Sequence, residues 1–118
     1  LSTAEAEYIA LSQGLREVIP LMTLMEEIHP IFSVQVTQPK FVCKVHEDNQ
    51  SCIKMANAEK FTPRTKHIAL KYHHFKSVVR EGRISMDYIR TEDQKADLLT
   101  KPLADELFFR LRFMLCGW

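Results

Sequence analysis

The sequence predicts an α/β fold in which two parallel strands are joined through helices. Two short segments have strand character: an apolar run at 41–45, and an alternation of apolar and polar residues at 83–90. Apolar residues recur at helical spacing in most of the remaining chain. Because parallel strands need a long, usually helical connection, this order of elements predicts a right-handed crossover.

Length and composition fit one globular domain. The chain has 118 residues, of which 46% are hydrophobic and 26% charged. An odd number of cysteines without CxxC spacing predicts a reducing compartment and no disulfide framework. No apolar run approaches the ~20 residues of a membrane span, and residues 1–118 contain no segment with the pattern of a signal peptide. Because the chain lacks an initial Met and opens on a helix cap, we expect it to be part of a longer protein.

Charge is unevenly distributed. Residues 1–31 hold five acidic residues and one basic residue, whereas residues 54–90 hold nine basic and three acidic ones. The basic segment fits either a surface that faces a polyanion or an ordinary solvated helix surface.

A first helix is predicted from Ser2, which forms a capping-box pattern with Glu5. Its apolar stripe consists of Ala4, Tyr8, Leu11, Leu15 and Val18. Glu7 lies on the inward side of this stripe, as either a first-turn acid favoured by the helix dipole or a functional carboxylate. Pro20 is expected to break or kink the helix, with a second short helix running to about Ile28 and ending at His29.

Residues 32–39 are predicted to be a loop or an irregular strand, and the buried strand follows at 41–45. Asp48 and Asn49 form a turn pair before a helix at Gln50–Asn57. Asp48 therefore lies at the carboxyl end of a buried strand, where open α/β sheets place their ligands. Strand alternation predicts that the preceding Glu47 faces away.

The second half begins with a loop at 58–65 and a helix at Lys66–Glu81, which Gly82 terminates. After the second strand, Thr91 and Gln94 form another capping-box pattern. The short helix that it opens is expected to carry Asp93 and Asp97 on one face. Asp93 is expected to interact mainly with the helix dipole, and the alternative is a metal ligand one turn before Asp97. Pro102 ends this helix, and a last amphipathic helix is predicted at 105–115.

Four motifs, in order, resemble the ribonuclease H domain at the end of copia-type retrotransposon polyproteins. They are residues 2–11 (STAEAEYIAL), 47–50 (EDNQ), 64–75 (RTKHIALKYHHF) and 91–103 (TEDQKADLLTKPL). The resemblance implies a ribonuclease H-like fold, with a mixed five-stranded sheet between helices. It also implies hydrolysis of the RNA strand of RNA–DNA hybrids with two divalent metal ions, Mg²⁺ or Mn²⁺, held by acidic residues.

By position in these motifs, the catalytic and metal-binding acids are Glu7, Asp48 and Asp97. The family's first catalytic aspartate lies on a strand upstream of the first motif, so residues 1–118 are expected to form a truncated, N-terminally incomplete domain. We therefore expect weak metal binding and almost no hydrolysis from this segment alone. The edge of the Asp48 strand is expected to be open to self-association.

The third motif supplies the candidate contacts to nucleic acid: Arg64, Lys66, His67 and Lys71. The implied partners are an RNA–DNA hybrid and the upstream reverse transcriptase region of the polyprotein. The implied location is intracellular, in the cytoplasm, a virus-like particle or the nucleus, without a membrane partner. The alternative is a non-catalytic remnant that binds nucleic acid or associates with itself.

Overall fold

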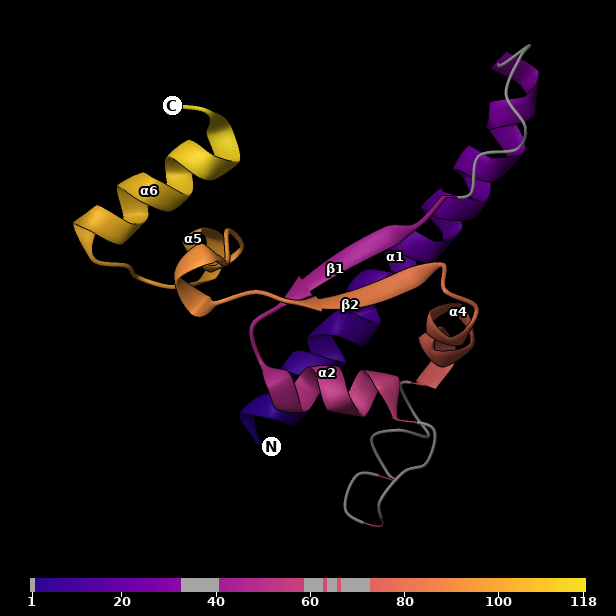
Figure 1. The fold of residues 1–118 in the computed structure, drawn as a ribbon, viewed down its shortest axis with the longest axis horizontal. Coiled ribbons are helices and arrows are strands. Elements are labelled where there is room, and N and C mark those ends of the chain that lie inside the picture. Colours follow the sequence, from indigo (N-terminus) through magenta and orange to yellow (C-terminus); the bar gives the residue numbers. More distant parts are fainter. Residues whose placement is uncertain (1, 33–40, 59–62, 64–65, 67–72) are drawn as a thin grey trace.

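A computed structural model describes residues 2–32, 41–58, 63, 66 and 73–118 (Figure 1). Its elements, in chain order, are α1 (Thr3–Phe32), β1 (Cys43–Glu47), α2 (Gln50–Asn57), the 3₁₀ turn η1 (His73–Phe75), α4 (Lys76–Arg80), β2 (Ile84–Tyr88), the 3₁₀ turn η2 (Thr91–Asp93), α5 (Asp97–Thr100) and α6 (Asp105–Cys116). Much of the predicted loop at 32–39 and of the predicted helix at 66–81 lies outside the described residues.

The two described strands are parallel, which confirms the α/β class and the parallel pairing. Their register pairs Cys43 with Ile84 and Glu47 with Tyr88. The first strand therefore starts two residues later than predicted. The apolar run begins at Phe41, but the ladder begins where β2 supplies a partner, and Cys43 N–H donates to the Arg83 carbonyl at 2.8 Å.

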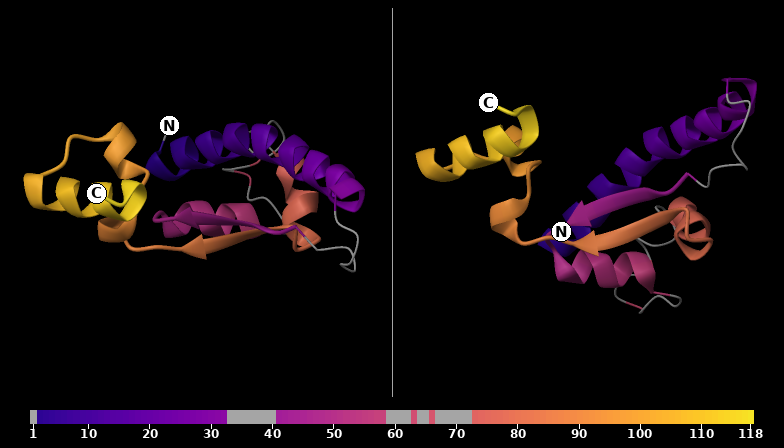
Figure 2. Two further views of the ribbon diagram at one scale, coloured as in Figure 1. Left: turned by 90° about the horizontal axis from the view of Figure 1, so that it is seen from above. Right: turned by 45° about the horizontal axis from the view of Figure 1, so that its top comes forward.

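Helix α1 lies across one face of the sheet, whereas α6 stands away from it (Figures 1 and 2). The main core lies between α1, α2, α4 and the strands. Tyr8 and Phe75, both fully buried, meet there with ring centroids 5.4 Å apart. The other buried members of this core are Leu15, Met22, Cys52, Ala56, Val78 and Ile84.

Of the break or kink predicted at Pro20, the break is wrong, because α1 continues through Pro20 and Pro30 to Phe32. A proline inside a helix leaves the carbonyl four residues earlier without its donor. Here both Pro20 and Arg16, which carries that carbonyl, are exposed, so water can satisfy the carbonyl. The predicted capping box at the other end is confirmed: Glu5 N–H donates to Ser2 Oγ at 3.2 Å.

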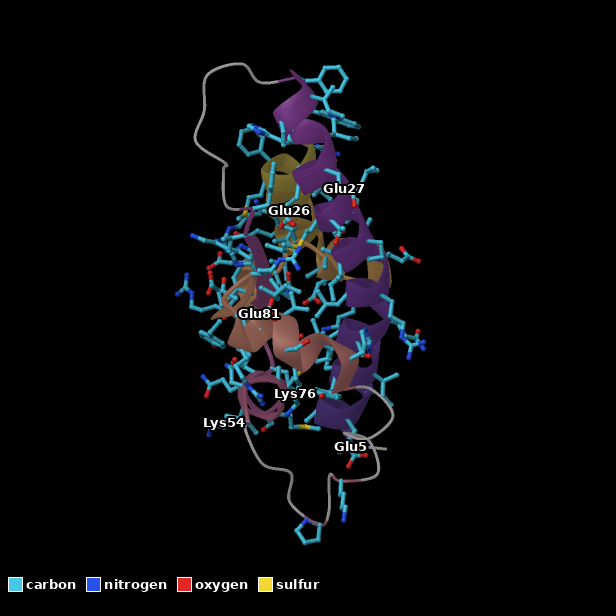
Figure 3. All side chains as sticks on the ribbon, turned by 90° about the vertical axis from the view of Figure 1, so that its right-hand side faces the viewer. Glu5, Glu26, Glu27, Lys54, Lys76 and Glu81 are labelled. Atoms are coloured by element: carbon cyan, nitrogen blue, oxygen red, sulfur yellow. The ribbon has the colours of Figure 1, made fainter. Side chains whose placement is uncertain are left out.

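Beyond Met22, α1 makes little contact with the core. Leu21 and the large apolar side chains beyond Met22 are at least a third exposed; the latter are Leu24, Met25, Ile28, Ile31 and Phe32. Glu26 on this part of the helix pairs with Arg83 at 3.0 Å, whereas Glu27 is exposed (Figure 3).

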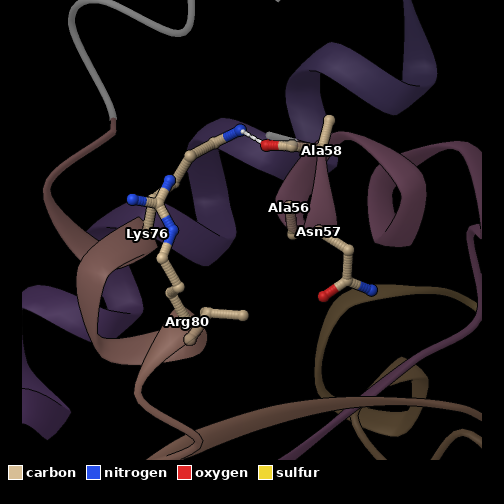
Figure 4. A pocket seen from close by; sticks show the side chains of 6 residues that line it. Ala56, Asn57, Ala58, Lys76 and Arg80 are labelled. Carbon is tan, nitrogen blue, oxygen red and sulfur yellow. Dashed lines mark hydrogen bonds between the residues drawn. The ribbon is translucent and has the colours of Figure 1, made fainter. Parts of the chain in front are cut away.

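Helix α2 matches its prediction and is held at both ends. At its start, the Asn49 side chain accepts the Cys52 N–H at 3.0 Å. At its end, Lys76 Nζ donates to the carbonyls of Met55 at 3.0 Å and Ala58 at 2.8 Å, beside a small pocket (Figure 4). Burial, with a smaller effect from nearby Arg80, lowers the pKa of Lys76.

The C-terminal segment departs from the prediction of one helix carrying Asp93 and Asp97. Residues 91–93 form a 3₁₀ turn and α5 starts only at Asp97, so the two acids do not share a helix face. Asp93 instead pairs with Arg90 at 3.2 Å and with Arg110 of α6. It thereby ties α6 to the turn after β2.

Glycine follows two of the helices, at the positions where the sequence predicted that each helix ends. Gly82, with a φ of 77°, follows α4, and Gly117, with a φ of 80°, follows α6. Both occupy the left-handed region that only glycine adopts readily. In the described part of the chain, no helix combines the length and apolar character needed to cross a membrane.

Candidate metal centre

A cleft of about 520 Å³ opens where the start of α1, the end of β1 and α5 meet. Its lining includes all three acids that the sequence singled out, Glu7, Asp48 and Asp97. Glu47 and Lys101 line it as well. The fold therefore brings together residues from three distant parts of the chain.

The position of Glu7 follows from the packing of α1. Tyr8 is fully buried against Phe75, which fixes the rotation of the helix. Glu7 is consequently half-buried at the edge of the core. Ala6 and Ala10 also line the cleft, and their small side chains leave space around the carboxylate.

Asp48 lies just past the end of β1, in a turn fixed by its neighbours. Asn49 N–H donates to Glu47 Oε1 at 3.0 Å, and Ile89 N–H donates to the Glu47 carbonyl at 3.0 Å. Gln94 Nε2 adds a bond to the His46 carbonyl at 3.0 Å. These bonds hold the strand end against the segment that leads to Asp97.

The prediction that Glu47 faces away from the site is wrong. One carboxylate oxygen each from Glu7, Glu47 and Asp48 lie within 4.8 Å of one another. Glu47 is the last strand residue and shares a sheet face with Cys43 and Val45, whereas Asp48 is already in the turn. Strand alternation therefore turns Glu47, 7% exposed, into the protein, and the bend brings Asp48 to the same place.

Asp97 lines the same cleft but is not part of this group of three. It is 8% exposed and pairs with Lys101, with 3.2 Å between Asp97 Oδ1 and Lys101 Nζ. Backbone bonding adds to this, because Lys101 N–H donates to the Asp97 carbonyl at 2.9 Å. Lys101 was not among the predicted site residues, although its spacing of four residues from Asp97 is that of a helical ion pair.

The electrostatics of the cleft are dominated by its carboxylates. Burial raises the pKa of Glu47, and repulsion by Glu7 and Asp48 adds to this, although the Asn49 N–H opposes it. The hydrogen bond to Asp97 raises the pKa of Lys101, and attraction by Asp97, Asp48 and Glu7 contributes. Behind the cleft, burial and then the charges of Glu47 and Glu7 raise the pKa of the Cys52 thiol to about 12.

The raised pKa of Glu47 predicts a pH dependence of stability for the metal-free chain. Above the ordinary pKa of 4.5 the unfolded chain loses this proton, while the folded chain keeps it until the raised pKa is reached. The folded state then binds more protons, so the free energy of unfolding falls as pH rises through this window. Urea unfolding between pH 4 and 8 is expected to show this fall, and Glu47→Gln is expected to reduce it. An unchanged pH profile in Glu47→Gln would contradict the assignment.

The candidate nucleic-acid contacts are only partly described. Lys66 is exposed and does not line the cleft, whereas Arg64, His67 and Lys71 lie outside the described residues. Among the described lining residues, Lys101 is the one lysine or arginine.

Sequence comparison relates the chain to transposon polyproteins of plants. It is 34% identical over 116 residues to the "Retrovirus-related Pol polyprotein from transposon TNT 1-94" of Nicotiana tabacum, covering 98% of this chain and 8% of that protein. The Pol polyproteins from transposons RE2 and RE1 of Arabidopsis thaliana are 32% and 31% identical over 107 residues, covering 91% of this chain and 7% of each. The chain resembles part of a retrotransposon Pol polyprotein.

This Pol-like segment is short beside its relatives, since it spans less than a tenth of their length. No protein-family model matches it. No solved structure matches it either.

The donor set of the Pol-like segment fits a hard divalent cation. Three carboxylates offer oxygen atoms within 4.8 Å of one another, and Asp97 lines the same space. Mg²⁺ and Mn²⁺ prefer oxygen ligands, and carboxylates gathered this closely repel one another unless a cation balances them. All three cysteines are free, but the two that the structure places in or beside the core, Cys43 and Cys52, do not line the cleft.

Proposed function

We propose that this segment is the C-terminal part of a ribonuclease H-like domain within a retrotransposon Pol polyprotein. In the intact polyprotein the domain would hydrolyse the RNA strand of RNA–DNA hybrids. One observation carries the proposal: acids from the first helix, the end of the first strand and a late short helix line one cleft. The similarity to Pol polyproteins over nearly the whole chain supports the same context.

In this proposal the chain's own residues form a negatively charged cation-binding site. Glu7 and Asp48 supply carboxylates from two elements, and the Asn49 and Ile89 bonds keep the strand end in place. Glu47 adds a third carboxylate, and Asp97 lines the same cleft. Divalent cations bound there would activate water and stabilise the leaving oxygen of a phosphodiester.

The 118-residue chain alone is expected to be almost inactive. The resemblance assigns one more aspartate to a strand upstream of Ser2, and that aspartate is not among these residues. A site that lacks one of its carboxylates binds cations more weakly and holds them less rigidly. The test of the proposal is therefore cation binding, rather than hydrolysis by this chain.

Mn²⁺ titration of the purified chain tests this cation-binding site. The electron paramagnetic resonance signal of the free ion reports how much Mn²⁺ remains unbound. Asp48→Asn is expected to weaken binding by about tenfold or more, because it removes a charged ligand while keeping the shape of the side chain. The matched control is Asp105→Asn, at an exposed position outside the cleft. It is expected to leave the affinity unchanged.

Equal Mn²⁺ affinities for the wild type and Asp48→Asn would sink the proposed function. Such a result, together with dimers in sedimentation, would favour the second candidate, a non-catalytic self-associating module. Two features support that candidate: the described sheet has only two strands, and large apolar side chains are exposed along α1 and α6.

A further inference from the structure

Lys101 lines the acidic cleft and pairs there with Asp97. It caps the C-terminal end of α5, and its ammonium lies 3.2 Å from Asp97 Oδ1. The Lys101 side chain is 51% exposed, whereas the Asp97 side chain is 11% exposed. The pair is therefore anchored on the Asp97 side and open to solvent on the lysine side.

The surroundings of this pair are unusually acidic. Glu7, Glu47 and Asp48 line the same cleft, and the charges of Asp48 and Glu7 reach the Lys101 ammonium. No other lysine or arginine lines the cleft among the residues that the structure describes. In the absence of a bound cation, Lys101 is thus the one described lysine or arginine lining the cleft that offsets the charge of carboxylates that repel one another.

We propose that Lys101 is the built-in counter-ion of this cleft and competes with a divalent cation for Asp97. Without the cation, the ammonium neutralises Asp97 and keeps its carboxylate directed at the end of α5. When a cation enters, Asp97 can act as a ligand only after its bond to Lys101 loosens. Lys101 therefore sets the affinity of the site for divalent cations. This inference rests on the proposed function, because it needs the cleft to bind a cation.

The proposal predicts that loss of Lys101 raises the Mn²⁺ affinity, whereas loss of a ligand lowers it. Removing the ammonium leaves Asp97 available and increases the negative potential, so Lys101→Met is expected to tighten Mn²⁺ binding about fivefold to thirtyfold. A buried carboxylate without its partner also destabilises the fold. The metal-free variant is therefore expected to melt at a lower temperature, and saturating Mn²⁺ is expected to raise its melting temperature by more than that of the wild type.

Two substitutions keep the test specific. Lys101→Arg retains the positive charge and is expected to bind Mn²⁺ much as the wild type does. Lys95→Met makes the same change in net charge at an exposed position that does not line the cleft, and should leave the affinity within about twofold. Should Lys101→Met fold poorly, Lys101→Gln removes the charge while retaining a hydrogen-bonding group.

The outcomes separate this inference from the proposed function. Wild-type binding that depends on Asp48, with unchanged or weaker binding in both Lys101→Met and Lys101→Gln, overturns the role of Lys101 alone. Absence of Asp48-dependent Mn²⁺ binding in the wild type overturns the proposed function, and the counter-ion role with it. Equal tightening in Lys95→Met would show that net charge, and not the pair with Asp97, governs affinity.

Discussion

Phe75→Ala is expected to lower the free energy of unfolding by about 3–5 kcal/mol, the largest stability loss we predict. Phe75 is fully buried, and its ring contacts those of Tyr8 on α1 and His74 beside it. It joins η1 and α4 to the helix that carries Glu7. Replacing it by alanine removes this aromatic contact and leaves a cavity that the surrounding helices can fill only in part.

Urea unfolding followed by circular dichroism measures this loss. Phe113→Ala is the matched control, since Phe113 is 64% exposed and the same deletion there is expected to cost about 0.5 kcal/mol or less. A loss below about 1 kcal/mol for Phe75→Ala would mean that the packing between α1 and η1 does not hold the domain together.

The elements that the sequence predicted well are those whose signals are local. The Ser2–Glu5 capping box, the α2 boundaries and the turn at Gly82 all depend on residues within a few positions of one another. The parallel pairing was also predictable, because a helical crossover leaves few other arrangements. The start of β1 was not, since it depends on where β2 begins to supply hydrogen-bond partners.

The failures at Pro20 and at Asp93 have a common cause, which is information that lies outside the local pattern. A proline breaks a helix only where the lost bond cannot be replaced, and exposure at Arg16 and Pro20 allows water to replace it. Asp93 was placed on a helix face by its spacing to Asp97. Its pairing with Arg110, from a helix well beyond it in the sequence, is a tertiary contact that spacing does not reveal.

The position of the candidate site and two of its acids were predictable from the sequence, but the full set of residues that form it was not. Glu7 was unusual for its place on an apolar face, and Asp48 for its place after a strand. Glu47 was missed because alternation was counted as if Asp48 belonged to the strand, when the bend already begins there. The four-residue spacing between Asp97 and Lys101 allowed an ion pair, but it did not reveal that Asp97 stays outside the group of three.

Removing two carboxylates at once is expected to produce the largest change in binding. In the double variant Glu7→Gln/Asp48→Asn, one of the three gathered carboxylates remains, so Mn²⁺ affinity is expected to fall by about 100-fold or more. Stability is expected to move in the other direction. At neutral pH the metal-free double variant is expected to be about 1–2 kcal/mol more stable than the wild type, because repulsion among half-buried carboxylates is relieved.

Opposite changes in affinity and stability are characteristic of a site that gathers like charges for a ligand, because ordinary structural residues lose both together. Mn²⁺ titration and metal-free urea unfolding of the same preparations measure the two effects. The control Glu17→Gln/Asp105→Asn changes the net charge equally at exposed positions and is expected to alter stability by less than about 1 kcal/mol. If the Glu7→Gln/Asp48→Asn variant lost stability and kept its Mn²⁺ affinity, these acids would be holding the fold together rather than a cation.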